Sequence, residues 1–75
     1  MLAALKQLRW RLAQQRQVAA YLIFSDRSLI DMAERKPRTR DEFAEVNGVG
    51  AAKLREFADV FINAIAAHRR ASGEG

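Results

Sequence analysis

Ten residues decide the fold, and they read Glu45-Val46-Asn47-Gly48-Val49-Gly50-Ala51-Ala52-Lys53-Leu54. Two of the four glycines in the sequence lie here, two positions apart, with helical patterns on both sides. Gly48 suits the left-handed backbone conformation that often closes a helix and that residues with a Cβ reach only at a cost. Gly50 lets the chain turn and begin another helix, whose first N–H groups have no partner within that helix. Because such N–H groups attract anions, the stretch is both an organiser of the fold and a candidate phosphate site.

Helical patterns flank this glycine hairpin on both sides. Before it, Thr39-Arg40-Asp41-Glu42 has the pattern of a capping box, in which a hydroxyl reaches forward and a carboxylate reaches back. It predicts a short helix that is buried through Phe43 and Val46 and ends at Asn47-Gly48. After the hairpin, helical spacing predicts one long helix over residues 50–70. The predicted core stripe of this long helix comprises Leu54, Phe57, Phe61, Ala64, Ile65 and His68.

The first half of the chain also predicts helices and turns. Residues 2–17 form an amphipathic pattern, with leucines at positions 5, 8 and 12 on one stripe. Ser28 suits the N-cap of a helix of two to three turns, which Pro37 stops. Residues 18–24 are a short apolar run whose period does not distinguish strand from helix. Since the chain contains no second strand candidate, we expect a short helix or an irregular turn there.

The composition excludes several classes of protein. Seventy-five residues suit one small domain, which we place at residues 1–70 with a disordered tail at 71–75. The absence of cysteine and the single histidine leave neither a disulfide nor a plausible zinc site. No apolar run approaches the length of a membrane span, and no nucleophile motif or paired His and carboxylate indicates an enzyme. We therefore expect a monomeric, non-catalytic binding module in the cytoplasm, without cofactor, metal or membrane contact.

The charge is distributed unevenly along the chain. Residues 1–40 carry nine basic and three acidic side chains, a net charge of +6. Residues 41–75 carry four basic and six acidic side chains, a net charge of −2. A one-sided excess of this kind favours a polyanionic partner, usually nucleic acid. A basic surface that only keeps a small domain soluble is the alternative interpretation.

Two aromatic residues in the basic half have two possible roles each. Trp10 lies about 140° from Leu5 on a helical wheel, away from the main apolar stripe. It could stack on a base, but the residues alone favour packing against a neighbouring helix. Tyr21 lies within the apolar run and could either bury its ring or expose it to an unpaired base. The residues alone favour the buried position.

The order of these features resembles the HRDC domain, the helical module at the C-terminus of RecQ-type DNA helicases and of ribonuclease D. The match covers nearly the whole chain and is most like the HRDC domain of a bacterial RecQ-type helicase. One departure is Ala19-Ala20, where the family often has one or two prolines before the tyrosine. The residues that carry the resemblance are Leu5, Leu8, Trp10-Arg11, Ala13, Ala20-Tyr21-Leu22-Ile23-Phe24-Ser25-Asp26, Ser28-Leu29, Met32-Ala33, Pro37, Glu42-Phe43, Val46-Asn47-Gly48-Val49-Gly50, Lys53-Leu54 and Phe61.

The resemblance implies a compact all-α bundle of about five helices, with the glycine hairpin before the long C-terminal helix. It also implies an auxiliary domain of an ATP-dependent DNA helicase, located at the bacterial nucleoid, that binds single-stranded or junction DNA weakly through a basic patch. An aromatic residue at the position of Tyr21 contributes to this contact in bacterial members, which favours an exposed ring. We place on the DNA-binding face Arg9, Arg16, Tyr21, Arg27, Arg38 and Lys53.

Two further functions stay open on the sequence. A protein-interaction module would dock on other domains of the parent helicase or on another partner through the acidic second half. The residues of that acidic surface are Asp41, Glu42, Glu45, Glu56 and Asp59. An HRDC domain of a ribonuclease D-like nuclease would instead bind RNA, because phosphate contacts do not distinguish RNA from DNA.

Overall fold

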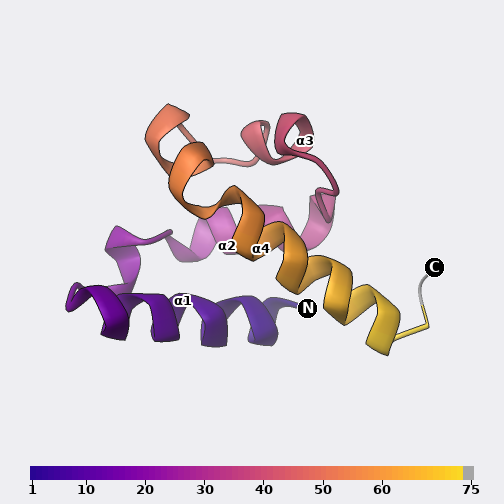
Figure 1. Cartoon of the computed structure of the whole chain (residues 1–75), viewed down its shortest axis with the longest axis horizontal. Helices are drawn as coiled ribbons and strands as arrows, with labels where there is room; N and C mark the ends of the chain where they lie inside the picture. The colour runs from indigo at the N-terminus through magenta and orange to yellow at the C-terminus, as the bar shows by residue number, and fades with distance from the viewer. Residues whose placement is uncertain (74–75) are drawn as a thin grey trace.

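The computed structural model describes residues 1–73, which form four α-helices and one 3-10 turn (Figure 1). The all-α class is confirmed, and the fifth predicted element is the 3-10 turn rather than a full helix. No helix in this described part is long and apolar enough to cross a membrane. In chain order the elements are α1 (Leu2–Arg16), η1 (Ala20–Leu22), α2 (Asp26–Arg35), α3 (Arg40–Ala44) and α4 (Ala51–Ala71).

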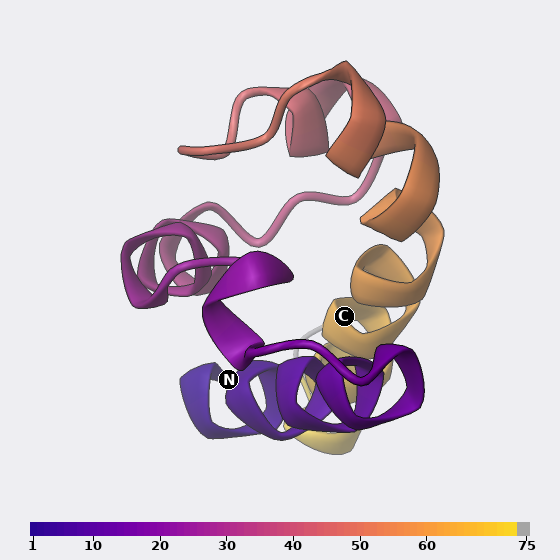
Figure 2. The ribbon, with the colours of Figure 1, turned by 90° about the vertical axis from the view of Figure 1, so that its left-hand side faces the viewer.

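The helices surround one core. α1 contacts η1, α2 and α4, and α3 packs against α4 on the opposite side of the molecule. In the turned view, α1, α2, α3 and α4 enclose a central space that their side chains fill (Figure 2). α4 extends to Ala71, one residue into the segment that we expected to be a tail. The rest of that expected tail includes residues 74 and 75, which lie outside the described residues.

Phe24 is at the centre of the core. It follows η1 directly, is 1% exposed, and meets three other phenylalanine rings edge to face. The ring centroids of Phe43, Phe57 and Phe61 lie 6.1, 5.7 and 5.1 Å from that of Phe24. Such pairs contribute about 0.5–1.5 kcal/mol each beyond the burial of their area. One residue outside any helix thus joins α3 and α4 to the N-terminal half of the chain.

The predicted helix caps are right at one helix and wrong at another. Thr39 caps α3 as expected, and its hydroxyl accepts the N–H of Glu42 at 3.1 Å. α3 ends at Ala44, earlier than predicted. Ser28 is not the cap of α2, because Ser25 takes that position and accepts the N–H of Ser28 at 3.2 Å. Both serines are suitable caps, and packing decides between them, since Ser28 is buried within the first turn of α2.

The glycine hairpin is pressed against this buried serine. Gly48 has a φ of +82°, so the left-handed conformation predicted from the sequence is confirmed. A Cβ at this position would lie 2.5 Å from the Oγ of Ser28, which leaves no room for any side chain. Gly50, by contrast, has an extended backbone, caps α4, and has open space where a Cβ would stand. Gly48 is therefore the glycine that the fold requires.

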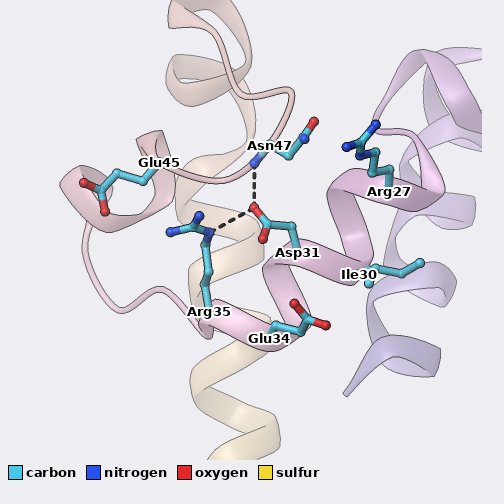
Figure 3. A pocket seen from close by; sticks show the side chains of 7 residues that line it. All are labelled: Arg27, Ile30, Asp31, Glu34, Arg35, Glu45 and Asn47. Atoms are coloured by element: carbon cyan, nitrogen blue, oxygen red, sulfur yellow. Dashed lines mark hydrogen bonds and ion pairs between the residues drawn. The ribbon is translucent and has the colours of Figure 1, made fainter.

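A carboxylate of α2 holds the hairpin in place. The Oδ2 atom of Asp31 accepts the backbone N–H of Asn47 at 2.8 Å and the Nε–H of Arg35 at 2.9 Å (Figure 3). The hydrogen bond from Asn47, with the Arg35 guanidinium as a smaller contributor, lowers the pKa of Asp31 below its ordinary value of 3.8. The ionised carboxylate thus fastens the residue before Gly48 to α2.

Replacement of Gly48 by alanine tests the close packing. We expect Gly48→Ala to lower the free energy of unfolding by about 1–2 kcal/mol through the left-handed backbone alone, and further through the clash with Ser28. Adding Ser28→Ala removes the clashing Oγ and should recover part of this loss. Gly50→Ser is the matched control and should leave stability unchanged or slightly higher, since serine is a favourable N-cap. Urea unfolding of the four proteins measures these differences. A double variant no more stable than Gly48→Ala would contradict the packing.

The Asp31 contact predicts a particular dependence of stability on pH. Because the pKa of Asp31 is lower in the folded state, its contribution is fully present above pH 3.8 and is lost as the pH falls through the folded value. We expect Asp31→Asn to lower the Tm at pH 7, and the difference from the wild type to shrink below about pH 4. Thermal unfolding by circular dichroism from pH 7 to pH 2.5 gives this difference. A gap that stayed constant over that range would show that ionised Asp31 does not hold the hairpin.

Candidate nucleic-acid interface

Tyr21 is the most exposed of the large apolar and aromatic residues in the described chain, at 71%. It lies in η1, and its neighbours Val18 and Leu22 are exposed as well. The next two residues, Ile23 and Phe24, are fully buried. Ile23 and Phe24 enter the core directly after η1, whereas Tyr21 and Leu22 within it face solvent. The buried position favoured by the residues alone is wrong, and the exposed position that the resemblance implies is what the structure has.

Lys53 of α4 holds the turn that carries Tyr21. Its Nζ donates hydrogen bonds to the carbonyl oxygens of Leu22 at 2.7 Å and Ile23 at 2.5 Å. It also lies 5.2 Å from the centroid of the Phe24 ring, within the range of a cation–π contact. Carbonyls at the end of a short helical turn have no partner within it, and the ammonium supplies one. Lys53, which we predicted to bind phosphate, therefore uses at least two of its N–H donors for hydrogen bonds within the domain.

Arg9 of α1 holds the end of the same segment. Its Nη1 donates to the carbonyl oxygen of Phe24 at 3.0 Å and pairs with Oδ1 of Asp26 at 2.7 Å. The hydrogen bond from Arg9 is the main reason why the pKa of Asp26 lies below its ordinary value. The Arg9 side chain is only 13% exposed, so little of it is accessible to a phosphate. Three consecutive carbonyls, at residues 22–24, are thus held by cations of two helices.

Arg16 lies beside this turn and is partly engaged. Its guanidinium pairs with Glu56 at 3.3 Å and lies 4.7 Å from the centroid of the Phe57 ring. About half of the side chain remains exposed. Together with Val18 and Leu22, these side chains border a groove of about 280 Å³ between the end of α1, η1 and the start of α4, which Lys53 also lines. The structure thus brings Arg16 and Lys53 to the turn that carries Tyr21.

Arg27 and Arg38 are exposed at opposite ends of α2. Arg27 lies in its first turn and borders a polar hollow of about 370 Å³ with Asp31, Arg35 and other residues (Figure 3). Arg38 follows the helix, beyond the buried Pro37. From Arg27 to the end of α2 at Arg35 the helix rises by about 12 Å, and Arg38 lies three residues beyond that end. The six predicted residues therefore do not form one compact patch, and the DNA contacts of Arg27 and Arg38 stay a prediction.

The acidic second half of the chain is partly neutralised in the fold. Asp59 of α4 receives two hydrogen bonds from the guanidinium of Arg40, at 2.8 and 3.1 Å. This contact lowers the pKa of Asp59 and raises that of Arg40. Glu56 pairs with Arg16, as described above. Arginines thus pair with two of the five carboxylates of the possible protein-docking surface.

Within residues 1–73, no three His, Cys, Asp or Glu side chains form a group that could hold a metal ion.

Trp10 is exposed, so the expected packing against a neighbouring helix is wrong. Its side chain is 60% exposed and lies outside the core cluster. The cause is its position on α1, because the leucine stripe of that helix faces α2 and α4 and Trp10 projects well away from it. The helical wheel already indicated this exposure, because it places Trp10 away from the leucine stripe. What favoured the wrong interpretation was the general tendency of tryptophan to be buried.

Comparisons with known proteins identify the family of this chain. The model of the family described as HRDC domain matches residues 1–65. The ATP-dependent DNA helicase RecQ of Pasteurella multocida is 38% identical over 68 residues, which cover 91% of this chain and 11% of that helicase. The ATP-dependent DNA helicase Q-like 4B of Arabidopsis thaliana is 36% identical over 67 residues, which cover 87% of this chain and 6% of that protein. The chain thus spans about a tenth or less of the length of these relatives.

A solved structure gives the same result for the fold. HRDC domain 3 of D. radiodurans RecQ superimposes with a TM-score of 0.85 at 32% sequence identity, over 88% of this chain and 87% of that one. The predicted resemblance to HRDC domains, and to those of bacterial RecQ in particular, is confirmed. This chain belongs to the HRDC domain family.

Proposed function

We propose that this domain is a non-catalytic accessory module of a RecQ-type DNA helicase that binds single-stranded or branched DNA weakly. The observation that carries the proposal is the exposed ring of Tyr21 on η1, where the carbonyl of Leu22 and those of the next two residues accept hydrogen bonds from Lys53 and Arg9. An exposed aromatic on a rigid support, bordered by cations, suits stacking on an unpaired base, which every base permits. The similarity to proteins named as DNA helicases supports DNA as the nucleic acid.

The predicted cations then divide into two roles. Arg16, Arg27 and Arg38 are exposed and would supply the sequence-independent attraction to phosphates. Arg9 and Lys53 would act through the turn, by keeping Tyr21 in a fixed position for stacking. This division keeps all six predicted residues in the site but assigns direct phosphate contact to only three of them. Weak binding follows, because few phosphates are neutralised on a single strand.

Removal of the tyrosine ring tests the stacking. We expect Tyr21→Ala to weaken binding of a fluorescein-labelled oligo(dT) by about 1–3 kcal/mol, or roughly 5- to 150-fold, without loss of thermal stability. Tyr21→Phe keeps the ring and should bind like the wild type, and Leu22→Ala controls for an exposed apolar neighbour. Fluorescence anisotropy at low salt measures the affinities. Unchanged affinity of Tyr21→Ala would exclude the stacking contact.

The same titrations separate the competing functions. With about three phosphates contacted on a single strand, the slope of log affinity against log salt should be about −2. At one salt concentration, the domain should bind single-stranded DNA more tightly than RNA or duplex DNA. Preference for RNA would support the nuclease-type function. If the domain binds no nucleic acid, the protein-interaction module is the remaining hypothesis.

Lys53 provides a test of positioning against phosphate contact. If Lys53 holds the turn, Lys53→Gln should lower both Tm and DNA affinity, leave the salt slope unchanged and speed hydrogen exchange at the Leu22 and Ile23 amides. If it instead contacts a phosphate, the slope should become shallower by about 0.7 at constant Tm. Arg55→Gln, at an exposed position on the same helix, is the control for charge alone. Salt titrations and exchange measured by NMR distinguish the two outcomes.

A further inference from the structure

The solvent-facing side of α1 combines one aromatic ring with cations and amides. α1 carries no carboxylate over its fifteen residues. One turn of helix from Trp10 in either direction lie Lys6, Gln7 and Gln14, which are exposed, and Ala13, which is buried in the core. Arg11, the next residue along the helix, is exposed as well. Asp26 lies close enough to Lys6 for the ammonium to help lower the pKa of that carboxylate, but Asp26 is already paired with Arg9.

We propose that this outer face of α1 is a second contact for single-stranded nucleic acid, in which Trp10 stacks on an unpaired base and Lys6 and Arg11 attract the flanking phosphates. The inference rests on the proposed function and extends it to side chains that are not among the six predicted site residues. Gln7 and Gln14 would offer hydrogen bonds to base edges or phosphates beside the ring.

The surroundings of Trp10 favour nucleic acid over a protein partner. Protein-docking sites contain a contiguous apolar centre with charged residues at the rim. Trp10 has no exposed apolar side chain beside it one turn away on α1, since Lys6, Gln7 and Gln14 are polar and Ala13 is buried. An isolated ring among cations is instead the arrangement that binds single strands, where stacking and phosphate attraction act together. Because α1 carries cations and no carboxylate, its charge complements that of a polyanion.

The chain carries its own reporter for this contact, because Trp10 is its single tryptophan. Titration of the wild-type domain with unlabelled oligo(dT) should quench the tryptophan fluorescence, and Tyr21→Ala should still show quenching at higher DNA concentration. Trp10→Ala should weaken binding about 5- to 150-fold with an unchanged Tm, since the side chain is exposed. Ile30→Ala is the matched control, as an exposed apolar residue on α2, and should bind normally.

The charges are tested separately from the ring. With Lys6 and Arg11 as two further phosphate contacts, the wild-type salt slope should be about −3.5 rather than −2, and Lys6→Gln with Arg11→Gln should make it shallower by about 1.4. Suppose that Tyr21→Ala weakens binding, that Trp10→Ala binds normally, and that DNA does not change the tryptophan fluorescence of the wild type. The second contact is then excluded, and the proposed function stands. If the wild type binds no nucleic acid, both fail, and a protein partner for this face becomes the better hypothesis.

Discussion

The close approach of Gly48 to Ser28 is the contact on which the rest of the structure depends. It requires a residue without a Cβ at one position and a small, buried side chain at the other. With the hairpin seated there, the N–H of Asn47 reaches Asp31, and α4 begins where Lys53 can bond to the turn before α2. The hairpin therefore organises the candidate interface from a distance, although nothing assigns it a direct contact with phosphate.

The cations of this domain show why net charge is a poor guide to a binding site. Arg9 and Lys53 donate hydrogen bonds to the backbone carbonyls of residues 22–24, and Arg40 pairs with a carboxylate of α4. Carbonyls at helix ends and buried loops need donors, and long cationic side chains supply them while keeping part of their charge near water. A basic sequence thus contains structural and functional cations that look the same until their partners are known.

The two exposed aromatic rings differ in how they are held. Tyr21 lies on a short turn that depends on hydrogen bonds from two helices, whereas Trp10 lies on the regular backbone of α1. Members of one domain family can vary such surface residues while the core is retained, because surface changes seldom affect stability. The fold match at 32% identity is consistent with that, since fold and surface need not vary together.

The sequence by itself determined what depends on near neighbours. Helical spacing predicted the core leucines of α1 and the buried phenylalanines of α4, the capping box predicted the start of α3, and the two glycines predicted the hairpin. Only the tertiary structure decided which serine caps α2, whether the ring of Tyr21 is buried, and what Arg9 and Lys53 bind. Those outcomes depend on partners 15 to 31 residues away, such as Phe24 for Arg9 and Leu22 for Lys53. Local patterns determine which side of a helix is apolar, but a contact between distant segments exists only once the chain has packed.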